Sequence, residues 1–421
     1  MKKYDKYKPT GSPWIGDVPE HWEVKRFRFV CNYKKGKNPK KLVFDFEDGM
    51  KPYLSMDYLR GTSNDVEYTF HEEGLVESKA GDLLLLWDGS NAGEFIISKD
   101  GYLSSTCALL SNKFESNSYF GYLCNVSEKY LKDMTNGMGI PHVDSNVFKN
   151  LTAIIPSQSE QESIVAYLDE KCGSVDKVIA KQERRIALLK ELKQSIISEA
   201  VTRGINPEAP LKATGIEWIG QIPEHWEVMP LKRTGSFGNG LTYSPDELCD
   251  EDGILVLRSS NIQNDKLCFE DNVYVKGCSD SLMVTPGDII ICSRNGSASL
   301  VGKCAMVENE LYATFGAFMM RYRPLRKANK KFSYYMLQAA LKLHKGLYST
   351  TTINQLTNAV IDQITVSYPP FSEQEVIAKY LDEKCGRFDI LISKATREIE
   401  LLKEYKQSII TEAVTGKIKV C

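Results

Sequence analysis

Residues 159–202 constrain the fold most, because the chain contains this stretch twice. It begins S-E-Q-E, ends S-I-I-S-E-A-V-T, and returns at residues 372–415 with 30 of 44 aligned positions identical. Apolar residues recur at intervals of seven, three and seven in both copies: Ile179, Ile186, Leu189 and Ile196, then Ile392, Ile399, Leu402 and Ile409. Such intervals form the seam of a coiled coil. Two matching seams in one chain predict two long helices that pack against each other as a spine.

Local signals predict where these helices begin and where they are interrupted. Ser159 with Glu162, and Ser372 with Glu375, have the three-residue spacing of a capping box, which predicts a helix start at each serine. Cys172-Gly173 and Cys385-Gly386 predict a turn within each copy. The long seam helix of the first copy is therefore expected over residues 176–202.

A second duplication fixes the order of the parts. Residues 11–24 return at 215–228 with 10 of 14 positions alike. Both copies combine turn formers with large aromatic residues, namely Trp14, Pro19, His21 and Trp22, then Trp218, Pro223, His225 and Trp226. We expect such a segment to cap a core or to dock under a helix end. A structural role for the two aromatic-flanked histidines is favoured over a catalytic one.

The two stretches between the duplicated segments differ in sequence and have the character of mixed α and β structure. In the first, we expect strands at 83–87, 94–98 and 106–110 and a helix at 118–134. In the second, we expect strands at 289–293 and 311–323 and a helix at 331–345. Residues 203–214, with two prolines and a glycine, are predicted to be a linker. The fold class is therefore α+β, with an internal pseudo-two-fold repeat.

Composition limits the cellular setting. The 421 residues contain no run of 18 apolar residues, and the N-terminus lacks the apolar core of a signal peptide. Eleven cysteines without a C-x-x-C motif favour free thiols in a reducing cytoplasm. We therefore expect a cytoplasmic protein without a membrane partner.

The distribution of charge is more informative than the net charge of −2. Residues 1–41 hold 12 Lys/Arg against 4 Asp/Glu, and residues 321–346 hold 8 Lys/Arg, no acid and several aromatics. Basic surfaces with interleaved aromatics attract a phosphate backbone. Charge alone leaves DNA or RNA binding and an ordinary solvated face equally open.

Candidate catalytic motifs fail on inspection. Residues 296–304 resemble a phosphate-binding loop, but five residues separate the glycines where four are needed, and Cys304 stands where a Mg²⁺-binding Ser/Thr belongs. Five scattered histidines offer no metal cluster. The sequence therefore assigns no nucleophile, base, metal or cofactor to this chain.

Small polar loops are the remaining candidates, and they suit recognition. Asn and Gln side chains suit adenine, whereas Arg and Lys suit guanine. The candidate DNA-binding residues lie in the loops at 88–94 and 294–303, in residues 136–149, and in their counterpart at 349–358: Ser90, Asn91, Asn136, His142, Asn146, Lys149, Arg294, Asn295, Ser297, Lys303, Thr351 and Asn354. The alternative, that the Gly-Ser loops are ordinary hairpin turns, stays open.

Taken together, the motifs resemble a known family. W-I-G-x-[IV]-P-E-H-W-E-V opens each half, and P-x-x-S-E-Q-E leads into a segment ending Q-S-I-I-[ST]-E-A-V-T. This order is similar to that of the specificity (S) subunit of type I restriction–modification enzymes. The resemblance implies two target-recognition domains, each reading one half of a bipartite double-stranded DNA site. It also implies two antiparallel conserved helices that hold two methyltransferase (M) subunits.

The same resemblance implies that catalysis belongs to partners. These are an adenine methyltransferase that uses S-adenosylmethionine and restriction (R) subunits that use ATP and Mg²⁺, so none of these cofactors is expected in this chain. The implied boundaries are target-recognition domains at 1–158 and 204–371 and spacer helices at 159–203 and 372–421. Unlike variable stretches predict an asymmetric, interrupted target.

Two other readings stay open. One is a non-DNA scaffold whose coiled-coil spine joins two ligand-binding domains, which salt-dependent duplex binding would distinguish. The other is a fused enzyme with concealed catalytic residues, which would require methyl transfer by this chain alone.

Overall fold

The computed structural model describes residues 2–62, 65–114, 116–137, 139–347 and 354–420. The chain forms two compact units. The first unit contains Met1–Gln182 and Arg397–Cys421, and the second contains Glu183–Thr396. Each unit thus combines one variable stretch with parts of both duplicated helical segments.

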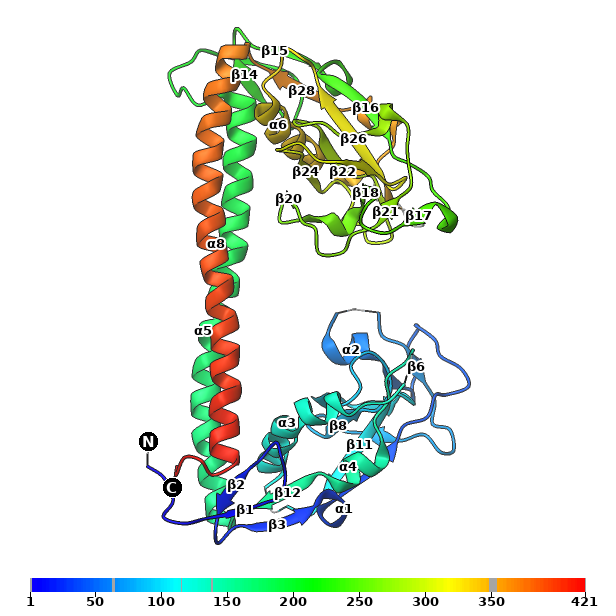
Figure 1. The fold of residues 1–421 in the computed structure, drawn as a ribbon, viewed down its shortest axis with the longest axis vertical. Coiled ribbons are helices and arrows are strands. Elements are labelled where there is room, and N and C mark those ends of the chain that lie inside the picture. The colour runs from blue at the N-terminus through cyan, green and yellow to red at the C-terminus, as the bar shows by residue number, and fades with distance from the viewer. Residues whose placement is uncertain (1, 63–64, 115, 138, 348–353, 421) are drawn as a thin grey trace. The chain divides into compact units, whose positions relative to one another are not determined.

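The first unit is built on two four-stranded sheets (Figure 1). One sheet is antiparallel throughout and has the order β4-β11-β8-β9. The other has the order β6-β5-β10-β7, with β5 and β10 parallel. The strands are β4 (Cys31–Lys35), β11 (Cys107–Asn112), β8 (Leu83–Leu86), β9 (Phe95–Ile97), β6 (Tyr68–Thr69), β5 (Lys51–Leu54), β10 (Gly101–Leu103) and β7 (Glu77–Ser78).

The leucine run of β8 explains how the antiparallel sheet is covered. Leu84 shares a core with Leu103 of the other sheet, whereas Leu85 shares a different core with Phe120 of the helix α3 (Asn117–Asp133). Side chains alternate between the two faces of a strand. A strand that is apolar at every position is therefore covered on both faces, which confirms the buried strand predicted at 83–87.

Short elements complete the first unit. Three of its helices have side-chain caps: Ser55 at α2 (Met56–Arg60), Ser116 at α3 and Asp144 at α4 (Ser145–Asn150). Such caps satisfy backbone N–H groups that the first turn leaves unpaired. The remaining elements are α1 (Phe27–Val30) and two antiparallel ladders, β1 (Tyr7–Pro9) with β2 (Asp17–Pro19) and β3 (Glu23–Arg26) with β12 (Thr152–Ile155).

The second unit repeats this plan. Its antiparallel sheet has the order β16-β26-β22-β24, and its other sheet has the order β17-β21-β18-β25 with β18 and β25 parallel. The strands are β16 (Gly235–Asn239), β26 (Met319–Pro324), β22 (Ile289–Cys292), β24 (Cys304–Met306), β17 (Leu248–Cys249), β21 (Tyr274–Val275), β18 (Ile254–Leu257) and β25 (Ala313–Phe315). Helix α6 (Lys330–Leu343) covers the antiparallel sheet as α3 does in the first unit.

The smaller elements of the second unit are partly shared and partly new. Two ladders match the first unit: β13 (Leu211–Ala213) with β14 (Gln221–Pro223), and β15 (Glu227–Pro230) with β28 (Thr365–Tyr368). Helix α7 (Asn358–Ile361) precedes β28 as α4 precedes β12. Among the described residues, the ladders added in the second unit are β19 (Ile262–Gln263) with β20 (Lys266–Leu267) and β23 (Arg294–Asn295) with β27 (Asn354–Gln355). The β23–β27 ribbon joins two predicted recognition segments, 294–303 and 349–358.

Most predicted elements are confirmed. Those expected at 94–98, 106–110, 118–134, 289–293 and 331–345 correspond to β9, β11, α3, β22 and α6. The single strand predicted at 311–323 is wrong, because the chain turns at residues 316–318 and passes from the sheet of β25 to the sheet of β26. The predicted linker at 203–214 is shorter, since a helix includes Arg203 and β13 begins at Leu211.

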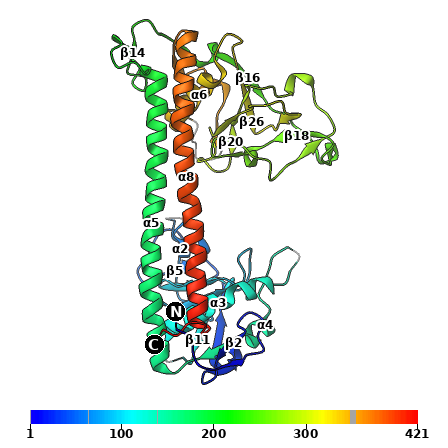
Figure 2. The same cartoon turned by 60° about the vertical axis from the view of Figure 1, so that its left-hand side comes forward.

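Two long helices, α5 (Gln158–Arg203) and α8 (Phe371–Val414), lie side by side in both views (Figures 1 and 2). In the first unit, Asp176 pairs with Lys406 and Gln182 with Glu398. In the second unit, Lys193 pairs with Asp389. Partner numbers fall on α8 as they rise on α5, so the helices are antiparallel. The predicted pair of long packed helices is confirmed.

The predicted seam is also confirmed. Each of its eight isoleucines and leucines is buried or half-buried, whereas neighbours such as Leu188 and Leu401 are exposed. The seam extends beyond the predicted residues at alternating intervals of three and four, through Cys172 and Val175 on α5. These spacings keep one stripe of each helix facing the other.

The predicted capping boxes are wrong. Helix α5 begins at Gln158, and the backbone N–H and Oγ of Ser157 donate to Glu160 at 3.2 and 2.8 Å. Helix α8 begins at Phe371, directly after Pro370, whose carbonyl accepts from Glu373 and Gln374. The S-E-Q-E motif is compatible with two positions of the helix cap. The glutamate that follows each predicted serine, Glu160 or Glu373, forms hydrogen bonds with a histidine and a tryptophan.

The predicted turns at Cys172-Gly173 and Cys385-Gly386 are also wrong, since α5 and α8 continue through them. Glycine in a helix interior costs about 1 kcal/mol relative to alanine. The two cysteines lie in buried clusters, 5% and 4% exposed, and we attribute the continuous helix to this seam packing. The first helix is accordingly longer than the expected 176–202.

Candidate nucleic-acid interface

In the first unit, four predicted recognition residues gather at one loop cluster, which we call the first loop cluster: Ser90, Asn91, Asn136 and His142. The loop after β8 meets the segment after α3 where Gly89 N–H donates to the carbonyl of Pro141 at 2.9 Å. Asn136 and His142 exchange backbone hydrogen bonds of 3.0 and 2.8 Å. All four side chains are exposed, so the cluster presents amide, hydroxyl and imidazole groups together.

Helix α4 carries the other two predicted residues of this unit, Asn146 and Lys149, both exposed. The Asp144 carboxylate joins α4 to the first loop cluster, because it accepts from Asn146 N–H at 2.7 Å and from the Asn136 amide at 3.4 Å. Phe148 is 1% exposed and packs edge-on against Trp87. Lys149 lies at the end of this anchored helix.

Sequence reasoning missed Lys35. Its ammonium lies 2.9 Å from the Asp88 carboxylate and 5.5 Å from the centre of the Trp87 ring, beside the loop that carries Ser90. The signal was present as the basic surplus of residues 1–41, but charge alone did not single out one lysine.

In the second unit, Arg294, Asn295, Ser297 and Asn354 form a second loop cluster. Arg294 and Asn295 pair with Gln355 and Asn354 in the β23–β27 ribbon. The Asn354 amide donates to the Gly296 carbonyl at 3.3 Å, and Ser297 N–H donates to Asn295 Oδ1 at 3.0 Å. The cluster follows β22 just as the first loop cluster follows β8. Thr351 lies outside the described residues.

Lys303 is placed differently from the other candidates. Its side chain is half-buried, and its ammonium donates to the Ile262 carbonyl at 2.9 Å. The Lys303 ammonium therefore binds the β19–β20 hairpin and is not part of the cluster that contains Arg294.

Phe318 is a second residue that sequence reasoning missed. The Arg294 guanidinium lies 5.6 Å from the centre of its ring, which is 61% exposed. The Phe318 carbonyl accepts from the backbone N–H groups of Ser293 and Arg294 at 3.0 and 3.1 Å. The turn at 316–318 brings this aromatic side chain next to Arg294. Sequence reasoning missed this turn because it predicted one continuous strand at 311–323.

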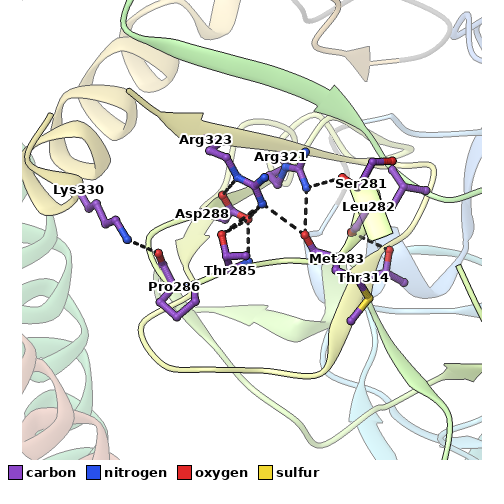
Figure 3. A network of polar contacts seen from close by, with 10 residues as sticks. All are labelled: Ser281, Leu282, Met283, Thr285, Pro286, Asp288, Thr314, Arg321, Arg323 and Lys330. Carbon is purple, nitrogen blue, oxygen red and sulfur yellow. Dashed lines mark hydrogen bonds and ion pairs between the residues drawn. The ribbon is translucent and has the colours of Figure 1, made fainter. Parts of the chain in front are cut away.

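A buried ionic network supports the strand that leads to the second loop cluster (Figure 3). Asp288, 1% exposed, accepts from Arg323 Nε at 2.7 Å and Nη2 at 2.6 Å, and from Thr285 N–H at 2.8 Å. The hydrogen bond to Asp288 raises the pKa of Arg323. Burial lowers the pKa of Arg321, which donates to the Ser281 and Met283 carbonyls. These bonds fix β22 against β26.

The duplicated aromatic segment docks at the start of each long helix, as predicted. In the first unit, His21 Nε2 and Trp22 Nε1 lie 2.9 and 3.1 Å from Glu160 Oε1. In the second, His225 and Trp226 contact Glu373 in the same way, at 2.5 and 3.0 Å. Both tryptophans are buried. Burial alone would raise the pKa of Glu160, but hydrogen bonds from His21, Trp22 and Ser157 outweigh it and lower the pKa to about 2.

A second pair of contacts fixes each variable stretch to the long helices. Tyr122 of α3 donates to Asp169 of α5 at 2.7 Å, and Tyr335 of α6 donates to Asp382 of α8 at 2.9 Å. The two aspartates are equivalent in the duplication, 213 residues apart. Burial and the hydrogen bond to Asp169 raise the pKa of Tyr122, so its hydroxyl stays a donor.

Comparisons with known proteins agree with this repeated plan. The family described as type I restriction modification DNA specificity domain matches the chain twice, over residues 19–190 and 223–401. The type I restriction enzyme MjaVIII specificity subunit of Methanocaldococcus jannaschii is 31% identical over 418 residues, covering 96% of this chain and 94% of that protein. The EcoKI specificity subunit of Escherichia coli strain K12 is 30% identical over 206 residues, covering 47% of this chain and 44% of that protein.

A solved chain is similar in fold. It comes from work on complex assembly and conformational transition of the type I R-M system, and it aligns with a TM-score of 0.64 at 17% identity, covering 95% of this chain and 99% of that chain. In the described part of the chain, none of the helices combines the length and apolar character needed to cross a membrane.

Two repeated α+β units, each joining a recognition domain to a shared pair of helices, define a DNA specificity protein of the type I restriction–modification class. The chain belongs to this family and is a specificity (S) subunit, the recognition subunit rather than a catalytic one.

Proposed function

We propose that this chain reads an asymmetric, bipartite double-stranded DNA target, with one half-site for each unit. The observation that supports the proposal is the placement of the two loop clusters. They follow equivalent strands, β8 and β22, yet carry different side chains: Ser90, Asn91, Asn136 and His142 in one, and Arg294, Asn295, Ser297 and Asn354 in the other. Equivalent positions with unlike donors and acceptors suit the reading of two unlike half-sites.

In this proposal the recognition domains are residues 1–158 and 204–371, and the helical segments are 159–203 and 372–421. Asn146 and Lys149 border the first loop cluster and supply further polar and cationic groups, and Lys35 lies beside the cluster, paired with Asp88. Lysines of this kind position a protein on the phosphate backbone without reading bases. Lys303 is expected to act indirectly, because its ammonium holds the β19–β20 hairpin.

The proposal extends to partners: two methyltransferase subunits and restriction subunits, which would bind S-adenosylmethionine, ATP and Mg²⁺. The free thiols of the ten described cysteines suit an assembly working on DNA in the cytoplasm.

Duplicated exposed residues on the helix pair support two copies of one partner. In the first unit these are Val178, Leu401 and Tyr405, and in the second they are the equivalent Leu391, Leu188 and Leu192, all between 37% and 53% exposed. Helices α3 and α6 dock on one side of the seam, where they contact Asp169 and Asp382. By their heptad positions, the six exposed residues lie on the other side of the seam. An apolar patch that occurs twice suits a partner that binds twice.

The decisive test is a map of methylated adenines in the source cell, with and without this gene. We expect an interrupted motif with two unlike halves to be methylated only when the gene is present. Loss of no motif, or loss of a palindromic one, would overturn the proposal.

Half-site assignment needs matched variants in the assembled complex. Asn91→Ala with Asn136→Ala is expected to weaken discrimination at one half-site only, and Asn295→Ala with Asn354→Ala at the other, by about tenfold for each lost base contact. The readout is binding to duplexes in which each half-site is scrambled in turn. Equal loss at both half-sites for either variant would reject the loop clusters as reading elements.

A further inference from the structure

Arg294 differs from the other basic side chains around the second loop cluster in the bonds of its guanidinium. The others each form a hydrogen bond or an ion pair within the protein. Lys303 donates to the Ile262 carbonyl at 2.9 Å, Lys345 donates to the Ser299 carbonyl at 3.3 Å, and Arg258 pairs with Asp271 at 2.9 Å. Among the described residues, the Arg294 side chain has a ring contact with Phe318 and neither an ion pair nor a hydrogen bond. Its five donors are therefore available to a ligand.

The same residue is held in place from both sides. Its backbone lies in the β23–β27 ribbon, where it pairs with Gln355, and its N–H donates to the Phe318 carbonyl at 3.1 Å. The guanidinium lies 5.6 Å from the centre of the Phe318 ring. A planar guanidinium packed on an aromatic ring loses less freedom when it binds, because its orientation is already restricted.

The surroundings favour a base over a phosphate. A two-stranded ribbon fits the major groove of B-DNA, and this ribbon carries the amides of Asn295, Asn354 and Gln355 beside Arg294. In that groove the guanine edge presents two acceptors, O6 and N7, which match the parallel donors of one arginine fork. The first loop cluster holds Ser90, Asn91, Asn136 and His142, without an arginine or lysine among them.

We infer that Arg294 is a specificity-determining residue that reads a guanine in the half-site bound by the second unit, through a bidentate contact to O6 and N7. This inference rests on the proposed function and adds the identity of one base. It predicts that the half-site assigned to the second unit contains at least one guanine whose N7 is needed for binding.

The test uses the complex of the full chain with its methyltransferase partners and a duplex carrying the mapped target. Each guanine of that half-site is replaced in turn by 7-deazaguanine, which lacks the N7 acceptor and keeps base pairing. We expect one replacement to weaken binding by the wild-type complex about tenfold, the loss for one arm of a bidentate contact. With Arg294→Ala, the same replacement should cause no further loss, because the contact is already absent.

Two further variants separate a base contact from a phosphate contact. Arg294→Lys keeps the charge without the fork, so it should lose the preference for guanine at that position while retaining part of the affinity. Arg326→Ala removes an exposed arginine in the segment after β26, and it should keep the full 7-deazaguanine effect. Thermal unfolding of each variant checks that the second unit remains folded.

The outcomes are distinguishable. If wild type shows no preference among duplexes, the proposed function fails. If wild type is specific but Arg294→Ala weakens every duplex equally, Arg294 contacts phosphate and the inference is overturned. If the 7-deazaguanine effect persists in Arg294→Ala, another residue reads the guanine and the inference is likewise overturned.

Discussion

Lys193 on α5 donates to Asp389 on α8, with the ammonium 2.7 Å from Oδ1 and the lysine side chain only 14% exposed. The pair recurs in the other unit as Lys406 with Asp176, also at 2.7 Å. Both lysines lie in the seam, where an otherwise apolar helix interface would tolerate many alignments. A charged seam residue that pairs with a carboxylate on the facing helix fixes the register and the antiparallel direction.

Lys193→Ala is therefore expected to destabilise the second unit by about 1–2 kcal/mol, because it removes the partner of a half-buried carboxylate. Lys406→Ala should cost less, about 0.5 kcal/mol, since Asp176 is 54% exposed. Urea unfolding of the full chain, followed by circular dichroism, measures both. Lys171→Ala, which breaks an exposed pair between neighbouring residues with Glu170, is the control and should change nothing measurable. An equal effect of all three variants would contradict the assignment.

Glu160 predicts a pH dependence. Its pKa is about 2 in the folded chain against 4.5 for an ordinary glutamate. A carboxyl whose folded pKa is depressed stabilises the fold above the unfolded pKa, and this contribution is lost as the pH falls from about 4.5 to about 2. The shift corresponds to about 2–3 kcal/mol for this side chain, which is 11% exposed.

Glu160→Gln is expected to lose that amount near neutral pH, and the difference from wild type should shrink as the pH falls below about 4.5 and close only near pH 2. Unfolding monitored by tryptophan fluorescence, to which the buried Trp22 contributes, measures the difference at each pH. Glu162→Gln, two residues further along α5 and exposed, is the control. A gap between Glu160→Gln and wild type that stays constant down to pH 3 would argue against the depressed pKa.

Asp288 and Asp82 offer a matched pair in the two units. Each accepts from the backbone N–H three residues before it, Thr285 and Lys79 respectively, at 2.8 Å, but only Asp288 also pairs with an arginine, Arg323. Asp288→Asn is expected to cost about 3 kcal/mol, because it leaves a partly buried guanidinium without its anion. Asp82→Asn should cost about 1 kcal/mol.

Calorimetry of both variants, with limited proteolysis to locate the loosened segment, checks this prediction. Cleavage should increase between Ser281 and Arg323 in Asp288→Asn and stay unchanged there in Asp82→Asn. Equal destabilisation would mean that the backbone bond, rather than the arginine, carries the effect.

Gly240 and Gly36 occupy equivalent positions, each one residue past the first strand of the antiparallel sheet. A Cβ at either position would lie 2.1 Å from a backbone carbonyl oxygen, of Gly316 and of Ser104 respectively. Gly240→Ala and Gly36→Ala should each destabilise their unit by about 3 kcal/mol, since backbone on both sides must move. Gly277→Ala, where nothing lies within 4 Å, should be nearly neutral in the same thermal unfolding assay, and alanine variants as stable as wild type would contradict the crowding.

Several features followed from the sequence because they depend on local pattern or on repetition. The seam of α5 and α8 shows as apolar residues at coiled-coil spacing, and the duplication indicated that the two helices bury each other. The strand at β8 was predictable because a short apolar run after Gly81-Asp82 has few other solutions. The docking of His21 and Trp22 under a helix end followed from aromatics set among turn formers.

Other features needed the folded chain. The S-E-Q-E motif is compatible with two positions of the helix cap. Helix α5 begins at the earlier of the two, where Glu160 accepts from Trp22, 138 residues away in the chain. Glycine at Cys172-Gly173 signalled a turn, but burial of the cysteine in the seam outweighs the local preference. From residue type and loop position alone, we predicted that Lys303 would act together with Arg294. In the structure, the Lys303 ammonium donates instead to the Ile262 carbonyl of the β19–β20 hairpin.

The sequence by itself determined that this protein is a two-fold repeat on paired long helices with unlike inserts, because periodicity and duplication are written in consecutive residues. Only the tertiary structure decided which polar side chains meet. The β23–β27 ribbon joins Arg294 to Gln355 across 61 residues of chain, and the turn at 316–318 brings Phe318 beside it. Contacts between residues so far apart in the chain depend on how the sheets pack, and local sequence patterns carry no information about that packing.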